Sequence, residues 1–317
     1  MKIVAVLFSI LTLGSTVVAT ADAAAAPRTS LSLNDGWSFR QVSREELYPA
    51  EVPGVVHLDL LRNELIAEPF YAYVEEGLQW IGKTDWEYRK EFSVSQGVIE
   101  RKNIELVFDG LDTYAEIYLN DELVLEAINM YRWWRVPVEG LLKAEDNELR
   151  VIFRSPITKD LHRVAEAGYQ LPAANDKEEG TSPYTRKAPY SFGWDWGPRF
   201  VTAGIWKPVR LEAWDDVRLV DVFIRQIELG EKKARLEADV EMLGDDNASG
   251  SVTVEIHVDG AAVASEMIRL EAGTRAHTVS FEIDDFYDLA DEMGLLVWEA
   301  FHFSTSLYPV AVGGHHT

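Results

Sequence analysis

The segment IELVFDGLDTYAEIYLNDELVL, residues 104–125, decides the fold class of this chain. Residues 104–108 and 115–119 are rich in β-branched and large apolar side chains with polar residues between them, as half-buried β-strands are. Asn120 and Asp121 then turn the chain into a further short strand. Short strands that follow one another through turns predict a β-sandwich.

The same pattern continues on both sides of this segment. An Asp-Gly turn stands between two short strand-like runs near the start, and a short helix is expected after Gly54. The chain is therefore mainly β, and we expect residues 27–213 to form one jelly-roll-like sandwich. Its further strands are predicted at residues 31–39, 86–94, 149–153 and 205–213, and Ser155 and Pro156 are expected to end the third of these.

A second unit is predicted after Trp214. Five segments there alternate like strands, whereas an immunoglobulin-like sandwich has roughly seven. Residues 214–284 are therefore interpreted as a partial immunoglobulin-like sandwich. The five segments are residues 217–229, 234–242, 251–258, 261–270 and 278–283.

The loop FGWDWGPR, residues 192–199, is the candidate site. A glycine on each side permits a sharp turn, and Pro198 argues against a central strand. Trp194 and Trp196 flank the carboxylate of Asp195, and sugars are bound by carboxylates and aromatic faces of this kind. The alternative is a loop whose tryptophans fill one end of the sandwich while Asp195 caps a backbone amide. The residues alone leave both interpretations open.

The charge balance limits the classes of partner. The 30 basic and 53 acidic residues give a net charge of −23, whereas nucleic acids and anionic membranes are bound by basic surfaces. A neutral oligosaccharide is the expected partner. The chain has no cysteine, which excludes disulfides, thiolate catalysis and cysteine-ligated zinc. No metal and no cofactor are expected.

The amino terminus has the composition of an export signal. Met1 and Lys2 precede an apolar run at residues 3–13, and small residues follow up to Ala26. We interpret residues 1–26 as a signal peptide of a secreted or periplasmic protein. A membrane anchor is the alternative, but the apolar run is short for a span.

Several segments of the chain resemble the amino-terminal part of β-mannosidases of the family 2 glycoside hydrolases. They are residues 52–61, 85–90, 108–113, 191–198, 204–209 and 286–294. The resemblance implies the jelly-roll sandwich, the immunoglobulin-like sandwich and, at residues 285–317, a short remnant of a (β/α)8 barrel. The implied activity is hydrolysis of terminal non-reducing β-D-mannose residues in β-mannosides, so the expected partner becomes a mannose-containing oligosaccharide.

The resemblance also implies roles for individual residues. Asp195 would hydrogen-bond hydroxyls of the terminal mannose, Trp194 and Trp196 would shape that pocket, and Trp298 would lie near its floor. The barrel segment departs from the family at Glu299, Ala300 and His302, which puts its part in the pocket in doubt.

No catalytic residue is assigned. Retaining glycoside hydrolysis needs two carboxylates about 5–5.5 Å apart, and a (β/α)8 barrel needs about 250 residues, far more than follow Asp284. The Asn63-Glu64 and Asn147-Glu148 pairs fall in the first sandwich and are interpreted as solvated surface. The chain is therefore expected to be a truncated, catalytically incomplete form. The alternatives are a stand-alone carbohydrate-binding module and an interaction protein that self-associates through the incomplete second sandwich.

Three lesser features complete the expectations. The cluster of Tyr131, Arg132, Trp133 and Trp134 is expected to pack in the sandwich rather than to form a sugar platform. Residues 247–249 form a glycosylation sequon. The two histidines at 315–316 are expected at a frayed end.

Overall fold

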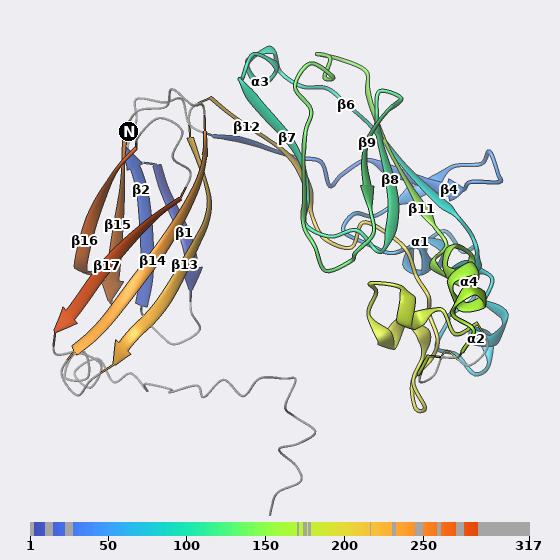
Figure 1. The fold of residues 1–317 in the computed structure, drawn as a ribbon. Helices are drawn as coiled ribbons and strands as arrows, with labels where there is room; N and C mark the ends of the chain where they lie inside the picture. The colour runs from blue at the N-terminus through green and yellow to red at the C-terminus, as the bar shows by residue number, and fades with distance from the viewer. Residues whose placement is uncertain are drawn as a thin grey trace, which may run out of the picture. The chain divides into compact units, whose positions relative to one another are not determined.

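The computed structural model divides the chain into two compact units, Ala26–Asp215 and a second made of Met1–Ala25 with Asp216–Thr317 (Figure 1). The residues that the structure describes are 3–9, 15–22, 28–169, 171–173, 176, 179–215, 217–229, 233–244, 250–258, 261–270 and 276–284.

The larger unit consists of two antiparallel sheets. A six-stranded sheet has the order β5-β4-β6-β11-β8-β9, and a four-stranded sheet has the order β10-β7-β12-β3. The strands of the first are β5 (Tyr48–Ala50), β4 (Trp37–Gln41), β6 (Trp86–Phe92), β11 (Asn147–Arg154), β8 (Tyr114–Leu119) and β9 (Glu122–Ala127). Those of the second are β10 (Trp134–Pro137), β7 (Asn103–Phe108), β12 (Val209–Trp214) and β3 (Thr29–Ser32).

One hydrophobic core joins the two sheets. Side chains alternate between buried and half-buried along β11, which is the period of a strand with one face in a core. Val151 of β11 lies opposite Tyr88 of β6 and Ile117 of β8, and all three are fully buried. From the other sheet, Leu106 and Leu211 pair across β7 and β12 and enter the same core. The predicted β-sandwich is therefore confirmed.

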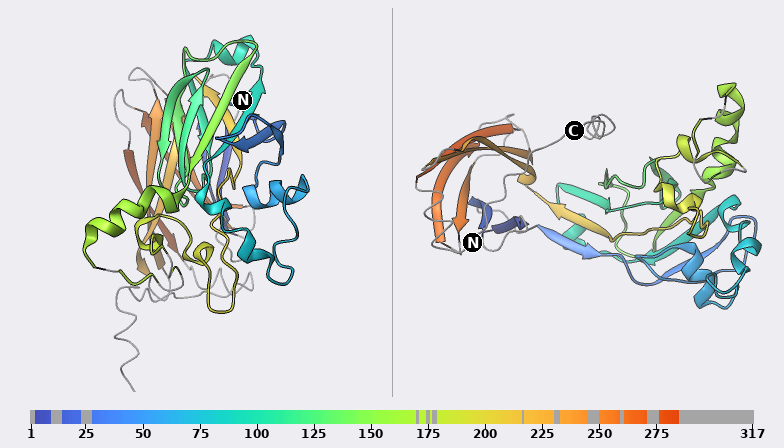
Figure 2. Two further views of the ribbon diagram at one scale, coloured as in Figure 1. Left: turned by 90° about the vertical axis from the view of Figure 1, so that its right-hand side faces the viewer. Right: turned by 90° about the horizontal axis from the view of Figure 1, so that it is seen from below.

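Helices cover one end of this sandwich. Figures 1 and 2 show α1 (Val56–Arg62), α2 (Val74–Gly77) and α4 (Pro156–Ala167) gathered there, with α3 (Gln96–Ile99) at the opposite end. The expected short helix after Gly54 is α1, and the Tyr88 hydroxyl ties it to the sheet by donating to Asp59 at 2.7 Å. The short 3-10 helices η1 (Ile81–Lys83), η2 (Ser182–Tyr184) and η3 (Pro189–Phe192) complete the unit.

Helix α4 was not predicted from the sequence. Ser155 and Pro156 were interpreted only as the end of the preceding strand. In the structure, the Ser155 side chain accepts a hydrogen bond from the amide of Thr158, so Ser155 is an N-cap, and Pro156 occupies the first helical turn. Gly168 ends the helix with a φ of 68°.

The smaller unit also consists of antiparallel strands. One sheet has the order β13-β14-β17 and the other β1-β2-β15-β16. The strands are β13 (Val217–Leu229), β14 (Lys233–Gly244), β17 (Ala276–Asp284), β15 (Gly250–Val258), β16 (Ala261–Leu270), β1 (Ile3–Ser9) and β2 (Ser15–Asp22). All five strands expected after Trp214 are therefore present.

Strands β1 and β2 fall within residues 1–26, which we interpret from the sequence as a signal peptide. In the structure β2 pairs with β15 from Ser15 opposite Val258 to Asp22 opposite Ser251. Both strands belong to the unprocessed chain. The removal of residues 1–26 as a signal peptide stays a prediction. Among the described residues, no helix is both long and apolar enough to span a membrane.

Several sequence expectations fall outside the described residues. They are the barrel remnant at 285–317 with Trp298, Glu299, Ala300 and His302, the sequon at 247–249, and the two terminal histidines.

Candidate functional site

The predicted loop is a tight hairpin. Trp194 and Gly197 exchange two backbone hydrogen bonds of 3.1 and 3.3 Å, so Asp195 and Trp196 form the turn between them. Residues 194–196 are the tip of the hairpin. Gly193 enters the hairpin with a φ of 90°, and a Cβ there would stand 3.1 Å from the Cβ of Arg199. A larger residue at position 193 would therefore be strained by the backbone conformation, and the Arg199 side chain would have to shift.

The side chains at the tip face solvent. Trp196 is 84% exposed and Trp194 is 47% exposed, with their ring centroids 6.5 Å apart at 62°. Asp195 is exposed as well, and no described residue hydrogen-bonds its carboxylate. The tryptophans thus do not fill the end of the sandwich, and Asp195 caps no amide among these residues. The tip instead presents one carboxylate and two indoles outward.

Arg199 fixes the hairpin at its base. Its guanidinium donates to Asp176 at 3.0 Å, to Glu179 at 2.8 Å and to Gln79 at 2.8 Å. The Arg199 amide donates to Glu75, and its carbonyl accepts from Gln79 at 3.0 Å. Because Asp176 is fully buried and Arg199 is mostly buried, these charge-assisted bonds are stronger than exposed ones. They tie the returning strand of the hairpin to α2 and to the segment before η2.

A buried ion pair lies on the same segment, on the N-terminal side of the hairpin. Lys187 is fully enclosed; its ammonium bonds the carboxylate of Asp112 and donates to the carbonyl of Thr202 at 3.0 Å. Asp112 and Gly204 also exchange backbone hydrogen bonds. This pair therefore holds the segment before the hairpin against the segment that follows it.

His57 of α1 lies beside the Lys187–Asp112 ion pair and contacts the segment that follows the hairpin. Its Nδ1 lies 2.9 Å from the hydroxyl of Thr202, and its ring meets that of Phe200 edge to face at 5.3 Å. Burial, helped by the nearby positive charge of Lys187, lowers the pKa of His57 to about 4. The imidazole is therefore neutral at physiological pH.

Several aromatic side chains of the larger unit are exposed to solvent. Phe70 contacts Phe200 at 5.2 Å and is itself 75% exposed. Tyr190, in the η3 segment that leads into the hairpin, is also exposed. Tyr71, Tyr73 and Tyr131 are exposed as well.

Two sequence interpretations are wrong. Tyr131 and Trp133 were expected to pack in the sandwich, but both are more than half exposed, and only Trp134 packs against the core. Asn147 was expected on the solvated surface, but it is fully buried. Its amide bonds the Phe92 carbonyl at 3.2 Å, because Asn147 begins β11 at the centre of a sheet.

The hairpin carries one ionisable side chain at its tip, that of Asp195. Its tip carries a single carboxylate, and retaining hydrolysis requires two. Within the described ranges, no group of three histidine, aspartate or glutamate side chains is placed to hold a metal ion.

Sequence reasoning found the hairpin but missed the groups that support it. Lys187 and Asp112 are 75 residues apart, and nothing local in the sequence marks a lysine within a run of turn-forming residues as buried. Asp112 lies in residues 108–113, one of the segments that resemble family 2 β-mannosidases. That resemblance was the one signal that pointed to Asp112.

The two antiparallel sheets around one core define the larger unit as a β-sandwich module. The chain belongs to the glycosyl hydrolase 2 galactose-binding domain-like family, whose model matches residues 37–207.

Individual relatives agree with this membership. The chain is 36% identical over 263 residues to β-mannosidase B of Thermothelomyces thermophilus, which covers 82% of this chain and 30% of the relative. It is 31% identical over 235 residues to the β-mannosidase of Mus musculus, covering 72% of this chain and 27% of the relative. The chain thus spans about 30% of the length of the curated relatives it matches.

A solved structure shows the same fold. The β-D-mannosidase of Dictyoglomus thermophilum superposes with a TM-score of 0.73 at 34% identity, covering 81% of this chain and 31% of that one. The resemblance to family 2 β-mannosidases is therefore confirmed by both sequence and structure.

Proposed function

We propose that the larger unit is the sugar-facing amino-terminal sandwich of a β-mannosidase-type glycoside hydrolase that acts on terminal non-reducing β-D-mannose residues. The observation that carries this proposal is the hairpin, whose tip holds Trp194, Asp195 and Trp196 in solvent while its base is fixed by Arg199. The choice of mannose as the sugar rests on the names of the matching relatives, which are β-mannosidases.

The tip would hold the sugar by two kinds of contact. Its Asp195 carboxylate accepts hydrogen bonds from two sugar hydroxyls, and the indoles cover the C–H faces of the ring. In water one such hydrogen bond contributes only about 0.5–1.5 kcal/mol. The hairpin alone therefore binds weakly, and its function requires a second surface that encloses the sugar.

Cleavage of the glycosidic bond is assigned to groups outside the described residues. We expect that the purified chain does not turn over a nitrophenyl β-D-mannoside, because the hairpin offers one carboxylate where the retaining mechanism uses two. Release of nitrophenolate should be followed with the Dictyoglomus thermophilum enzyme as positive control. Turnover that survives purification would refute this part of the proposal.

A substitution at the tip separates binding from folding. Asp195→Ala should change the free energy of unfolding by no more than about 0.5 kcal/mol, since the side chain is exposed and unpartnered. Urea unfolding followed by tryptophan fluorescence reports on the larger unit, because every tryptophan except Trp298 lies there.

The same Asp195→Ala variant should weaken mannobiose binding in a calorimetric titration. Trp133→Ala is the control, since it removes an exposed indole that the hairpin does not include. A large loss of stability in Asp195→Ala would favour a capping role for the carboxylate.

A stand-alone carbohydrate-binding module is the second candidate function. The fixed, outward-facing tip favours it, since a module of that kind needs only the sandwich. The mannobiose titration decides this candidate as well, because the absence of heat at millimolar sugar would remove it.

Export and self-association also stay proposals. If residues 1–26 are removed as a signal peptide, β15 loses its partner β2 and becomes an edge strand, and edge strands pair with other chains. Light scattering of the chain that begins after residue 26 tests this, and a monomer at all concentrations would contradict it.

A further inference from the structure

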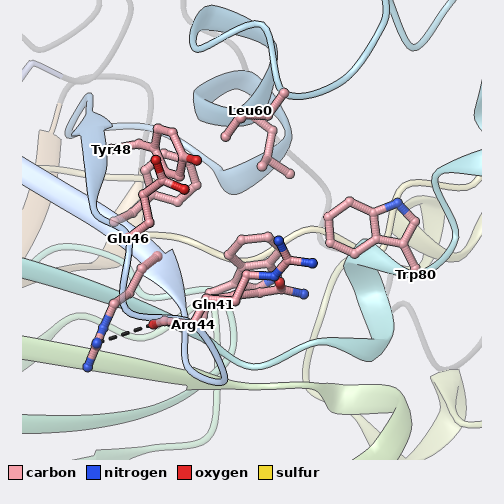
Figure 3. A pocket seen from close by; sticks show the side chains of 10 residues that line it. Gln41, Arg44, Glu46, Tyr48, Leu60 and Trp80 are labelled. Atoms are coloured by element: carbon pink, nitrogen blue, oxygen red, sulfur yellow. Dashed lines mark hydrogen bonds between the residues drawn. The ribbon is translucent and has the colours of Figure 1, made fainter.

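A pocket of about 290 Å³ lies in the larger unit, where β4 meets α1 and the segment before β6. Figure 3 shows Glu46 and Tyr48 on one side, Trp80 on the other, and Leu60 of α1 opposite Gln41 and Arg44. None of its lining residues belongs to the hairpin at residues 194–197. Its volume is near the lower end for small-molecule sites.

The base of this pocket is apolar and fixed. Phe39 is fully buried and lies 6.0 Å from the ring of Trp86, whose indole N–H donates to the Ile81 carbonyl at 3.1 Å. Arg40 is held by Glu87, with bonds of 2.6 and 2.5 Å. The polar groups of Trp86 and Arg40 already have hydrogen-bond partners, so these residues shape the pocket. Recognition of a ligand is therefore left to the residues at the rim.

The rim of the pocket carries polar groups that can still form hydrogen bonds with a ligand. The Arg44 guanidinium is exposed and makes no bond to another described residue. The Gln41 amide makes one long contact, 3.5 Å to the hydroxyl of Thr84. Glu46 stands beside the Tyr48 hydroxyl and raises the pKa of Tyr48, and its carboxylate oxygens can accept hydrogen bonds from a ligand.

Trp80 supplies an aromatic wall beside these groups. Its indole is 40% exposed and leans on Trp86 with ring centroids 5.9 Å apart. A tryptophan that is held on one side and open on the other presents a flat apolar face, and its partner Trp86 keeps that face in place.

We propose that this pocket is a second sugar site, which binds one neutral hexopyranose unit of an oligosaccharide. Arg44 and Glu46 carry opposite charges at the same rim, so neither an anion nor a cation is favoured there. Vicinal hydroxyls both donate and accept, and the rim offers donors (Arg44, Gln41) and acceptors (Glu46, Gln41) together. Trp80 covers the C–H face of the ring. The net charge of −23 further disfavours an anionic ligand.

The test uses the full chain with Asp195→Ala and Trp196→Ala, which removes the hairpin as a competing site. Saturation-transfer NMR is recorded with mannose, mannobiose, glucose, galactose and glucuronic acid as probes. We expect transfer to at least one neutral sugar, with millimolar affinity. Adding Arg44→Ala should weaken it about tenfold, the loss that follows from removing a charge-assisted hydrogen bond.

Two controls make the result decisive. The Arg44 guanidinium makes no bond to another described residue, so the Arg44→Ala variant should have the melting temperature of its parent, whereas Arg186→Ala removes another exposed arginine and should leave binding unchanged. No transfer to any neutral sugar would overturn the proposal. So would a preference for glucuronic acid, or equal affinities of the Arg44→Ala variant and its parent.

Discussion

Lys187→Met is expected to lower the free energy of unfolding of the larger unit by about 3–5 kcal/mol, the usual cost of removing one partner of a buried ion pair. The Lys187 side chain is fully buried and that of Asp112 is 4% exposed. Without the ammonium, the hydroxyl of Thr113 is the one side-chain donor left to the Asp112 carboxylate among the described residues. Its charge is then uncompensated in a site that water does not reach. Urea unfolding followed by tryptophan fluorescence measures the change.

The control for this variant is its neighbour. Arg186→Met removes a cation one residue away, but Arg186 is exposed and should cost no more than about 0.5 kcal/mol. A second variant isolates the pair: Lys187→Met with Asp112→Asn should recover part of the loss, since the uncompensated charge is gone. A Lys187→Met variant as stable as Arg186→Met would show that the ion pair does not hold the segments around the hairpin.

The strands of this fold could be predicted because their signal is local. Strand β11, for example, alternates between buried and half-buried side chains along its whole length, and one buried face is enough to specify a sheet. The exceptions in the larger unit are β5 and β10, which were not predicted. Helix α4 had a local signal too, Ser155 and Pro156 at its start and Gly168 at its end. It was missed because Ser-Pro also ends strands, and only the capping glycine distinguishes the two interpretations.

The site was predictable only in part, for a physical reason. The composition of the hairpin is local, so its turn and its chemistry could be predicted. Its support is not local: Arg199 is 120 residues from Gln79 and Lys187 is 75 from Asp112. Burial of Trp133 or Asn147 depends likewise on which elements cover them, and one sequence does not contain that information.

The stability of the larger unit should fall on mild acidification because of His57. Its pKa is about 4 in the folded chain and about 6.5 in an unfolded one. Between these values the unfolded state binds the proton and the folded state does not, so stability decreases as pH falls. From pH 7 to pH 5 the loss due to this one group is about 2 kcal/mol.

His57→Gln isolates that contribution. Glutamine does not titrate, and its amide can still reach the hydroxyl of Thr202, so the variant should lose about 2 kcal/mol less than the wild type between pH 7 and pH 5. Carboxylates and the other histidines change equally in both proteins. Lys187→Met should reduce the pH dependence as well, because the charge of Lys187 helps to keep His57 neutral. Parallel pH profiles for the wild type and His57→Gln would contradict the prediction, since they would mean that the imidazole titrates as it does in water.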